Sequence, residues 1–290
     1  MKFFSDVNME VDEKEVHDRL ESLSVHSISE TDREPLKKVF SFIDLTSLGE
    51  QDNAENVGQM CHKVNLLGEA YPSLPNVAAI CVFPELVPVV AEHLENPLVT
   101  IASVAGGFPS SQTFTEIKIR EVRLVLELGA EEVDIVLPVG KFLLGDYDLI
   151  KEEIKSIKNV MGSKILKVIL ETGSLNDLGL IRKASFLAMG SGADFIKTST
   201  GKIPVGATPE AMMVMCQAIK DYYNKTGKKI GIKPAGGISE PLTALNYYRI
   251  VEHVLGEEWL SAERFRIGAS RLANRIMAFI LGKDENFIYF

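Results

Sequence analysis

Four charged residues lie in apolar, β-branched runs of the sequence, where a charged side chain is costly to bury: Asp134, Lys167, Lys197 and Lys233. Burial disfavours the charged form of an amine or a carboxyl group unless it has a partner. A single lysine of this kind usually points outward between helices. Three lysines and one aspartate in similar runs instead indicate one shared reactive site.

The chemistry that fits two adjacent lysines is formation of an imine. Lys197 and Lys233 each end a short apolar run, and the two runs are consecutive in the predicted sheet. Neighbouring strands are roughly 5 Å apart, so each ammonium group disfavours the charge of the other and at least one pKa falls. A free amine attacks a carbonyl carbon. The spacing alone leaves open whether Lys197 or Lys233 is the nucleophile.

The acidic residue in this set suits proton transfer. Asp134 is placed to act as the general acid and base that imine chemistry needs. Lys167 is followed by apolar residues, so we expect it to lie deeper and to hold Asp134 ionised and oriented. A structural ion pair between Lys167 and either Asp134 or Glu171 predicts nearly the same geometry.

The elements that must position these residues form a regular series. Eight continuous apolar runs alternate with helical segments, as expected for parallel strands buried on both faces. The predicted strands are Val39–Leu45, Val77–Phe83, Val99–Val104, Val133–Leu137, Ile165–Leu170, Phe195–Lys197, Ile230–Lys233 and Phe265–Ile267. Their number and order predict an α/β fold, a (β/α)₈ TIM barrel. A doubly wound open sheet is the alternative, although it usually has fewer strands for this length.

Signals for the starts of helices support the predicted barrel. Asp52 with Glu55 predicts a capping box, and Thr208 before Pro209 predicts a helix that begins with proline. We expect residues 1–36 to be an N-terminal extension with one helix near residues 11–23. Residues 37–290 then form a single barrel with a C-terminal tail.

Glycine turns follow the last three predicted strands and suggest an anion site. They are Gly201-Lys202, Gly236-Gly237 and Gly268-Ala269-Ser270. Glycines allow close approach of the backbone to a phosphate, and barrels often bind phosphate after strands 7 and 8. Asp44 lies near the end of the first strand, where we expect it either to bind a substrate hydroxyl or to cap the turn before the next helix. Cys81 is a candidate for the pocket wall, although a packed thiol is the simpler interpretation.

Composition limits the other function classes. The 290 residues carry a net charge of −9, which argues against a nucleic-acid surface while leaving room for a local phosphate pocket. The three cysteines are widely spaced and read as reduced thiols. No histidine or cysteine spacing predicts a metal site. No apolar run has membrane-spanning length or the form of a signal peptide, so we expect a cytoplasmic protein without a membrane partner.

Several of these motifs together resemble the deoxyribose-phosphate aldolase family. The likeness runs from about residue 39 to 281 in unbroken order and rests on Ile43-Asp44-Leu45-Thr46, Val133-Asp134, Leu166-Lys167-Val168-Ile169, Asp194 to Lys202, Lys233-Pro234-Ala235-Gly236-Gly237 and Gly268-Ala269-Ser270. The resemblance implies a class I aldolase that cleaves 2-deoxy-D-ribose 5-phosphate into glyceraldehyde 3-phosphate and acetaldehyde. It implies no metal and no organic cofactor.

The resemblance also implies roles for individual residues. It assigns the imine to Lys197, makes Lys233 the perturbing cation and Asp134 the proton shuttle, and gives Lys167 a supporting role. The residues that match its substrate and phosphate motifs are Asp44, Thr46, Thr200, Gly201, Lys202, Gly236, Gly237, Gly268 and Ser270. Some members carry a functional tyrosine at the end of the chain, which makes the penultimate Tyr289 a further candidate.

Two positions depart from the pattern of the family. Ser239 stands where some members have arginine, and Arg271 stands where a second serine is common. We expect the Arg271 side chain to point outward into solvent. The expected partner is a small sugar phosphate, and a homodimer is a candidate assembly. The alternatives are a related Schiff-base sugar-phosphate aldolase, a transaldolase-like barrel, or a phosphate-binding barrel without catalysis.

Overall fold

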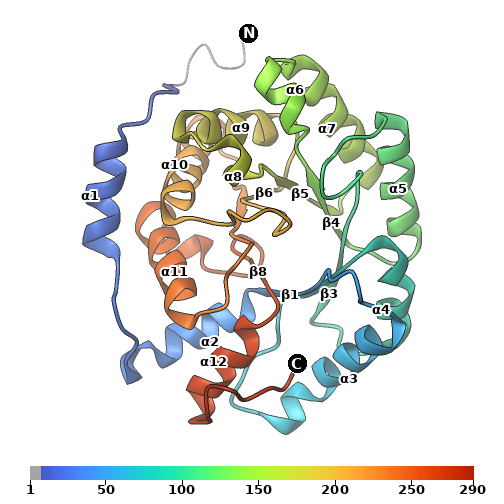
Figure 1. Cartoon of the computed structure of the whole chain (residues 1–290), viewed down its shortest axis with the longest axis vertical. Helices are drawn as coiled ribbons and strands as arrows, with labels where there is room; N and C mark the ends of the chain where they lie inside the picture. Colours follow the sequence, from blue (N-terminus) through green and yellow to red (C-terminus); the bar gives the residue numbers. More distant parts are fainter. Residues whose placement is uncertain (1–7) are drawn as a thin grey trace.

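Eight parallel strands form a barrel inside a ring of helices in the computed structural model, which describes residues 8–290 (Figure 1). The hydrogen-bonded order is β7-β6-β5-β4-β3-β2-β1-β8. Isolated parallel bridges join Ile232 to Phe265 and Ala235 to Gly268, so the two edges of the sheet also meet. The strands are β1 (Ile43–Ser47), β2 (Ala79–Val82), β3 (Thr100–Val104), β4 (Glu132–Val136), β5 (Ile165–Ile169), β6 (Phe195–Lys197), β7 (Gly231–Lys233) and β8 (Ile267–Ala269). The predicted (β/α)₈ barrel is confirmed.

Each strand is followed by helical structure on the outside of the barrel. The helices are α3 (Ala54–Ala70), α4 (Val87–His93), α5 (Thr115–Glu127), α6 (Val139–Leu144), α7 (Tyr147–Met161), α8 (Thr172–Leu175), α9 (Leu178–Gly190), α10 (Pro209–Thr226), α11 (Pro241–Leu255) and α12 (Leu272–Leu281). Their apolar faces cover the sheet: in α7, for example, Ile150, Ile154 and Ile157 recur at helical spacing and are buried. Because the helices cover the outer face, the strands are buried on both sides and read as continuous apolar runs.

The first and last predicted strands had the wrong bounds. Val39 belongs to α2 (Arg33–Ser41), and β1 begins only at Ile43. The buried residues Leu36, Val39 and Phe40 lie on one face of α2, and a short apolar run of this kind does not distinguish a helix end from a strand. At the other end of the chain, β8 extends to Ala269, two residues beyond the predicted end.

The two predicted helix starts had different outcomes. The first helix after β1 is capped by Asn53, whose side chain accepts hydrogen bonds from the amides of Glu55 and Asn56. The predicted box on Asp52 is therefore wrong, because the Asp52 carboxylate instead accepts hydrogen bonds from the hydroxyl of Ser47, at the end of β1, and from the amide of Gly49. The start of α10 is confirmed: the Thr208 side chain accepts from the amide of Ala211.

The N-terminal segment packs along the outside of the barrel. The helix α1 (Glu13–Leu23) lies beside α10 and α11, with Val16 and Leu20 buried (Figure 1). The backbone of Val25 and the side chain of Asn246 exchange two hydrogen bonds, of 2.9 and 3.2 Å. The expected division between residues 36 and 37 falls inside α2. Among residues 8–290, every helix is too short or too polar to cross a membrane.

Candidate active site

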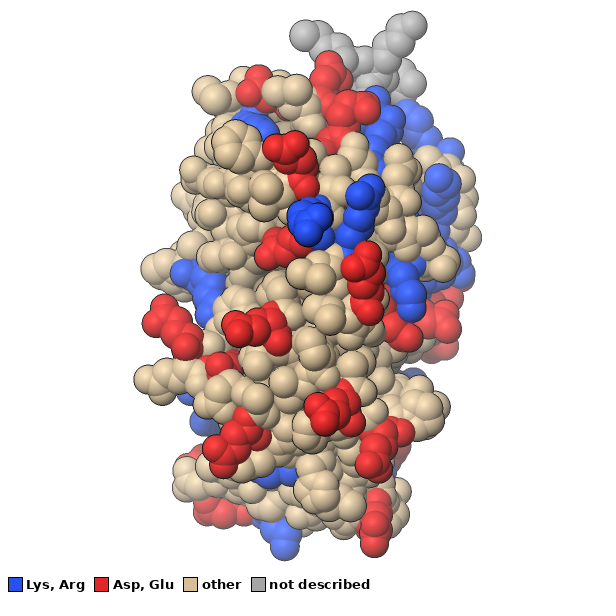
Figure 2. Space-filling view, turned by 90° about the vertical axis from the view of Figure 1, so that its right-hand side faces the viewer, with Lys and Arg blue, Asp and Glu red and all other residues tan. Residues whose placement is uncertain are grey.

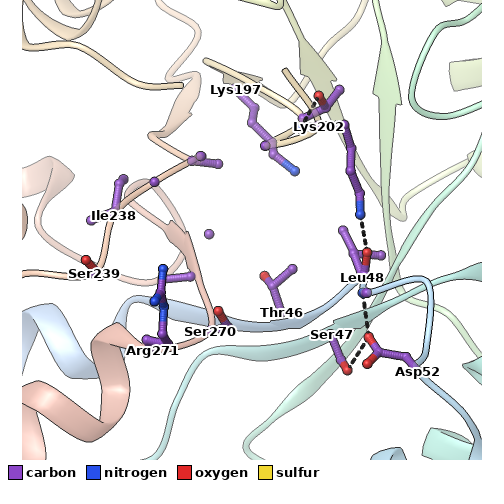
Figure 3. Close-up of a pocket in the computed structure, with 18 residues that line it drawn as sticks. Thr46, Ser47, Leu48, Asp52, Lys197, Lys202, Ile238, Ser239, Ser270 and Arg271 are labelled. Carbon is purple, nitrogen blue, oxygen red and sulfur yellow. Dashed lines mark hydrogen bonds between the residues drawn. The ribbon is translucent and has the colours of Figure 1, made fainter. Parts of the chain in front are cut away.

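A pocket of about 410 Å³ opens at the carboxyl ends of the strands (Figure 3). The loops after β1, β6, β7 and β8 form its wall. Eight predicted substrate-binding residues line it together with Lys197: Thr46, Thr200, Gly201, Lys202, Gly236, Gly237, Gly268 and Ser270. Figure 3 shows the Lys197 amine pointing into the space between Lys202 and Arg271. This is the end of a (β/α)₈ barrel at which active sites lie.

Beneath the pocket, Asp134 contacts all three of the strand lysines. Its Oδ2 lies 2.7 Å from the Nζ of Lys197 and 2.8 Å from that of Lys233. Its Oδ1 lies 3.3 Å from the Nζ of Lys167. The barrel register explains this convergence, because Asp134 is the partner of Lys167 across β4 and β5, and Lys197 is the partner of Lys233 across β6 and β7.

The surroundings of the three lysines separate Lys197 from the other two. Burial disfavours its ammonium form and lowers the pKa of Lys197, and the positive charge of Lys233 acts in the same direction, against the attraction of Asp134. Burial also opposes the charge of Lys233, but Asp134 and Asp44 outweigh it and raise the pKa of Lys233. The pKa of Lys167 is raised for a similar reason, through Asp134, Asp44 and Glu132. Lys197 is therefore the amine that most readily loses its proton.

The two aspartates of this cluster remain ionised. Burial alone would raise the pKa of Asp134, but Lys167, Lys197 and Lys233 together hold that pKa well below its usual range. The pKa of Asp44 is likewise lowered, against the cost of burial, by Lys167, Lys233 and Arg266. The Asp44 carboxylate accepts hydrogen bonds from Lys233 and Arg266 and lies below the pocket. Its contacts suit a counterion, and its binding of a substrate hydroxyl stays a prediction.

Two buried charged residues of the cluster were not foreseen. Glu132 accepts hydrogen bonds from Lys167 and from Arg266, at 2.8 Å for Arg266 Nη2. Glu132 immediately precedes the predicted run that starts at Val133, so it was read as outside the strand. Arg266 lies inside the predicted run Phe265–Ile267 and carries the same signal as the three lysines, a charge among apolar residues. Lys167 pairs with Glu132 and the two aspartates, whereas Glu171 has other partners.

Glu171 holds the loop that follows β6. Its backbone has a positive φ of 55°, and its carboxylate accepts from the Thr200 amide at 3.1 Å and from the Thr200 hydroxyl at 2.6 Å. The Thr200 oxygen in turn accepts from the amide of Lys202. The Lys202 amine donates to the carbonyl of Leu48 and lies 5.6 Å from the ring centre of Phe83. Figure 3 shows this lysine spanning one side of the pocket.

The glycine turns after β6 and β7 lie against each other. Gly201 and Gly236 both have positive φ, of 75° and 88°. A Cβ on Gly236 would lie 2.9 Å from the Cα of Gly206, which is too close for any side chain. The Ala207 amide also donates to the Ala235 carbonyl at 3.0 Å. Glycine is therefore required here both for the conformation and for the close approach of two loops.

Comparison with known proteins identifies the family. A model described as DeoC/LacD family aldolase matches residues 38–246. The chain belongs to this aldolase family. The deoxyribose-phosphate aldolase of Homo sapiens is 41% identical over 251 residues, covering 83% of this chain and 79% of the relative. That of Bos taurus is 40% identical over 247 residues, covering 82% and 78%.

A solved structure of the same kind agrees in fold. The deoxyribose phosphate aldolase from Aeropyrum pernix, described as having a unique tetrameric structure, has 25% sequence identity and a TM-score of 0.66. The match covers 87% of this chain and 98% of that one. The likeness therefore extends over the whole barrel of this DeoC/LacD family member.

Arg271 lies differently from the expectation. Its side chain is exposed to solvent but lines the pocket, beside Ser239 and Ser270 (Figure 3). The expected outward orientation is wrong, because Arg271 is the residue immediately before α12 and sits where the loop after β8 turns into that helix. The hydroxyl of Ser239 donates to Glu240 at 3.1 Å.

The two remaining candidates lie outside the set of described residues that line the pocket. Cys81 is fully buried inside the barrel, and burial raises the pKa of its thiol to about 11. Tyr289 donates its hydroxyl to the carbonyl of Lys63 at 2.8 Å, and its ring packs edge-on against Tyr71. Within residues 8–290, no group of three or more His, Cys, Asp and Glu side chains is arranged to hold a metal ion. The absence of a metal from the chemistry stays a prediction.

Proposed function

We propose that this protein is a class I aldolase that cleaves 2-deoxy-D-ribose 5-phosphate into glyceraldehyde 3-phosphate and acetaldehyde, reversibly, through an imine on Lys197. The observation that carries the proposal is the placement of this one amine. Lys197 lines the pocket, its pKa is lowered, and it lies 2.7 Å from a carboxylate oxygen of Asp134. The family membership supports the same reaction class.

The reaction follows from these groups. The free amine of Lys197 attacks the aldehyde carbon of the open-chain sugar, and loss of water gives an iminium ion. Removal of the proton from the hydroxyl on C3 then makes a carbonyl at C3 and breaks the bond between C2 and C3. The electron pair moves into the iminium to form an enamine, and glyceraldehyde 3-phosphate leaves. Protonation of the enamine carbon and attack by water on the imine release acetaldehyde.

The proton transfers are assigned to the groups around Lys197. Asp134 is ionised at rest, so in this proposal it accepts and relays protons rather than supplying the first one. Lys233 and Lys167, whose pKa values are raised, remain charged: the charge of Lys233 helps to lower the pKa of Lys197, and both lysines help to keep Asp134 ionised.

The mouth of the pocket is assigned to the phosphate. Lys202, the glycine turns and Ser270 before α12 lie on its wall. Backbone amides at glycine turns and a lysine amine both suit a dianion. This binding energy acts far from the bond that breaks and holds the substrate in a reactive position.

The test is reduction with borohydride in the presence of acetaldehyde, followed by peptide mapping. We expect a two-carbon adduct on Lys197, with Lys167 and Lys233 as internal controls in the same protein. An adduct on either of those lysines, with Lys197 unmodified, would overturn the assignment. Absence of any adduct on folded protein would favour a phosphate-binding barrel without catalysis.

The cellular setting and assembly are further parts of the proposal. A role in deoxyribose catabolism in the cytoplasm fits the reduced thiols and the small-molecule substrate, and fractionation of cells tests it. A homodimer is supported by exposed apolar side chains at α5 and α6: Phe114, which immediately precedes α5, Ile117 in α5 and Leu144 in α6. Figure 2 shows uncharged surface between separated acidic and basic groups on the face that carries α5. Light scattering in solution decides between monomer and dimer.

A further inference from the structure

Seven ionisable groups are almost fully buried in the barrel, Lys197 at the pocket wall and the other six beneath it, and their charges do not balance. Each of these residues is at most 4% exposed. Three are acids and four are bases: Asp44, Glu132 and Asp134 against Lys167, Lys197, Lys233 and Arg266. With every group charged, the cluster would carry one excess positive charge out of contact with water, which is unfavourable. One base must therefore give up its proton most easily.

Arg266 is the base that cannot do so. A guanidinium group stays protonated in proteins. Its Nη1 lies 2.7 Å from Asp44 Oδ1, and its Nη2 lies 2.8 Å from Glu132 Oε1. Arg266 therefore takes up much of the negative charge of two of the three carboxylates. It stands immediately before β8 and is not among the residues that line the pocket.

The three lysines differ in how many of the cluster's carboxylates they contact. Lys167 contacts Glu132, Asp44 and Asp134. Lys233 contacts Asp44 and Asp134. Among the carboxylates of residues 8–290, Lys197 contacts that of Asp134 alone, through the Oδ2 atom that Lys233 also contacts. The amine with the fewest counterions is the one that lines the pocket.

We propose that Arg266 is a positioning residue for catalysis: its fixed charge gives the sealed cluster its positive excess and thereby leaves Lys197 as a free amine. The proposal rests on the proposed function of Lys197 as nucleophile. It assigns to Arg266 an effect that passes through Asp44, Lys233 and Asp134 rather than through contact with substrate.

The other titratable groups near Lys197 leave this count unchanged. From β2, Cys81 presents a thiol that burial keeps protonated. After β5, Glu171 is occupied by the amide and hydroxyl of Thr200. At the pocket mouth, Lys202 donates to the Leu48 carbonyl and is open to solvent. The strand β3 contributes no ionisable side chain.

The experiment measures the proton on Lys197 directly. Acetic anhydride acylates an amine only in its unprotonated form, so the extent of Lys197 acylation against pH, read by mass spectrometry of its peptide, gives a midpoint. In Arg266→Met we expect the midpoint to rise by about one pH unit or more, which is roughly a tenfold loss of free amine near neutral pH. The pH at which kcat/KM falls to half on the acidic side of its profile should rise by the same amount.

Matched variants separate charge from structure. Arg266→Met with Glu132→Gln removes one base and one acid, keeps the excess and should return the midpoint to the wild-type value. Arg266→Lys keeps the charge without the two-pronged geometry, so its midpoint should also stay near wild type. If Arg266→Met alone does not fold, Glu132→Gln alone increases the excess and should move the midpoint to lower pH.

Two results would overturn the proposal. One is a midpoint that does not move in Arg266→Met, or that does not move down in Glu132→Gln. The other is a double variant or an Arg266→Lys variant that shifts as far as Arg266→Met, which would show that geometry rather than charge is responsible. Acylation reports on Lys197 whether or not the protein cleaves a sugar. A wild type with a low midpoint but no borohydride adduct would thus refute the aldolase and leave the charge count standing.

Discussion

The floor and the mouth of the pocket are built in opposite ways. The floor consists of side chains that point into the barrel from several strands and are almost fully buried, with Lys197, Lys233 and Asp134 at its top. The mouth consists largely of backbone at glycine turns, with exposed side chains such as Lys202 and Arg271. The difference teaches that the proposed reaction chemistry depends on a fixed set of charges, whereas anion binding depends on how closely loops approach one another.

This comparison predicts different signatures for substitutions in the two regions. A change in the floor should alter the pKa of Lys197 and act on every aldehyde substrate alike. A change in the mouth should leave that pKa unaltered and act on phosphorylated substrates only.

The largest effect is expected for Lys233→Leu in the floor. Loss of this charge removes a group that lowers the pKa of Lys197, so that pKa should rise. The free amine is the form that reacts, and it is present above the pKa, so activity near neutral pH should fall by roughly 100-fold for a rise of two units. Partial recovery at higher pH, measured as kcat/KM across the pH range, is the signature.

Lys233→Arg is the matched control, since it keeps the positive charge. Its acid limb should stay near the wild-type position even if its kcat falls through altered packing. An unchanged pH profile in Lys233→Leu would show that Lys233 serves packing only, and the floor would then lack the electrostatic role given to it.

An intermediate effect is expected for Lys202→Met in the mouth. The discrimination between 2-deoxyribose 5-phosphate and 2-deoxyribose should shrink by roughly 1.5–3 kcal/mol, the value of one hydrogen bond to a charged group. The ratio of kcat/KM for the two sugars measures it. An equal loss on both sugars would remove Lys202 from the phosphate site.

Arg271→Ala is the comparison variant for the same region. Its exposed side chain lines the pocket, so it should reduce the discrimination in the same direction, by about 0–1 kcal/mol because solvent screens an exposed charge. A loss larger than that of Lys202→Met would make Arg271 the principal cation for the phosphate.

The smallest effect is expected from a pair of glycine variants. Gly236→Ala and Gly237→Ala both place a side chain at positive φ, which costs about 1–2 kcal/mol of stability in each. Only at Gly236 would the new Cβ also meet the backbone of Gly206, whereas nothing lies within 4 Å of a Cβ at Gly237. Gly236→Ala should therefore raise KM for the phosphorylated sugar more than Gly237→Ala and should also lower thermal stability further. Equal KM values would show that the close contact of the loops does not shape the mouth.

The sequence allowed the fold and the central residues of the site to be predicted, because buried lysines in apolar runs are rare and barrel topology brings strand ends together. It did not separate Lys197 from Lys233, since the difference is the number of carboxylates that each one contacts. Glu132 was missed because the predicted strand began one residue too late. The orientation of Arg271 depends on the local turn before α12, and the hydrophobic periodicity of the sequence does not predict the conformation of that turn.

The contact between Arg266 and Asp44 has a consequence for how the barrel holds together. These residues are 222 positions apart and join the first strand to the segment that enters the last one. A barrel that lost β8 would leave the carboxylates of Asp44 and Glu132 without the guanidinium, at a cost of about 3–5 kcal/mol for a broken buried ion pair. Partly opened forms are thereby disfavoured, which hydrogen exchange at the amides of β8 would register as protection equal to that of β1. The groups that we assign to carbon–carbon bond cleavage thus also make the closed barrel cooperative, so that it opens as a whole rather than fraying from its last strand.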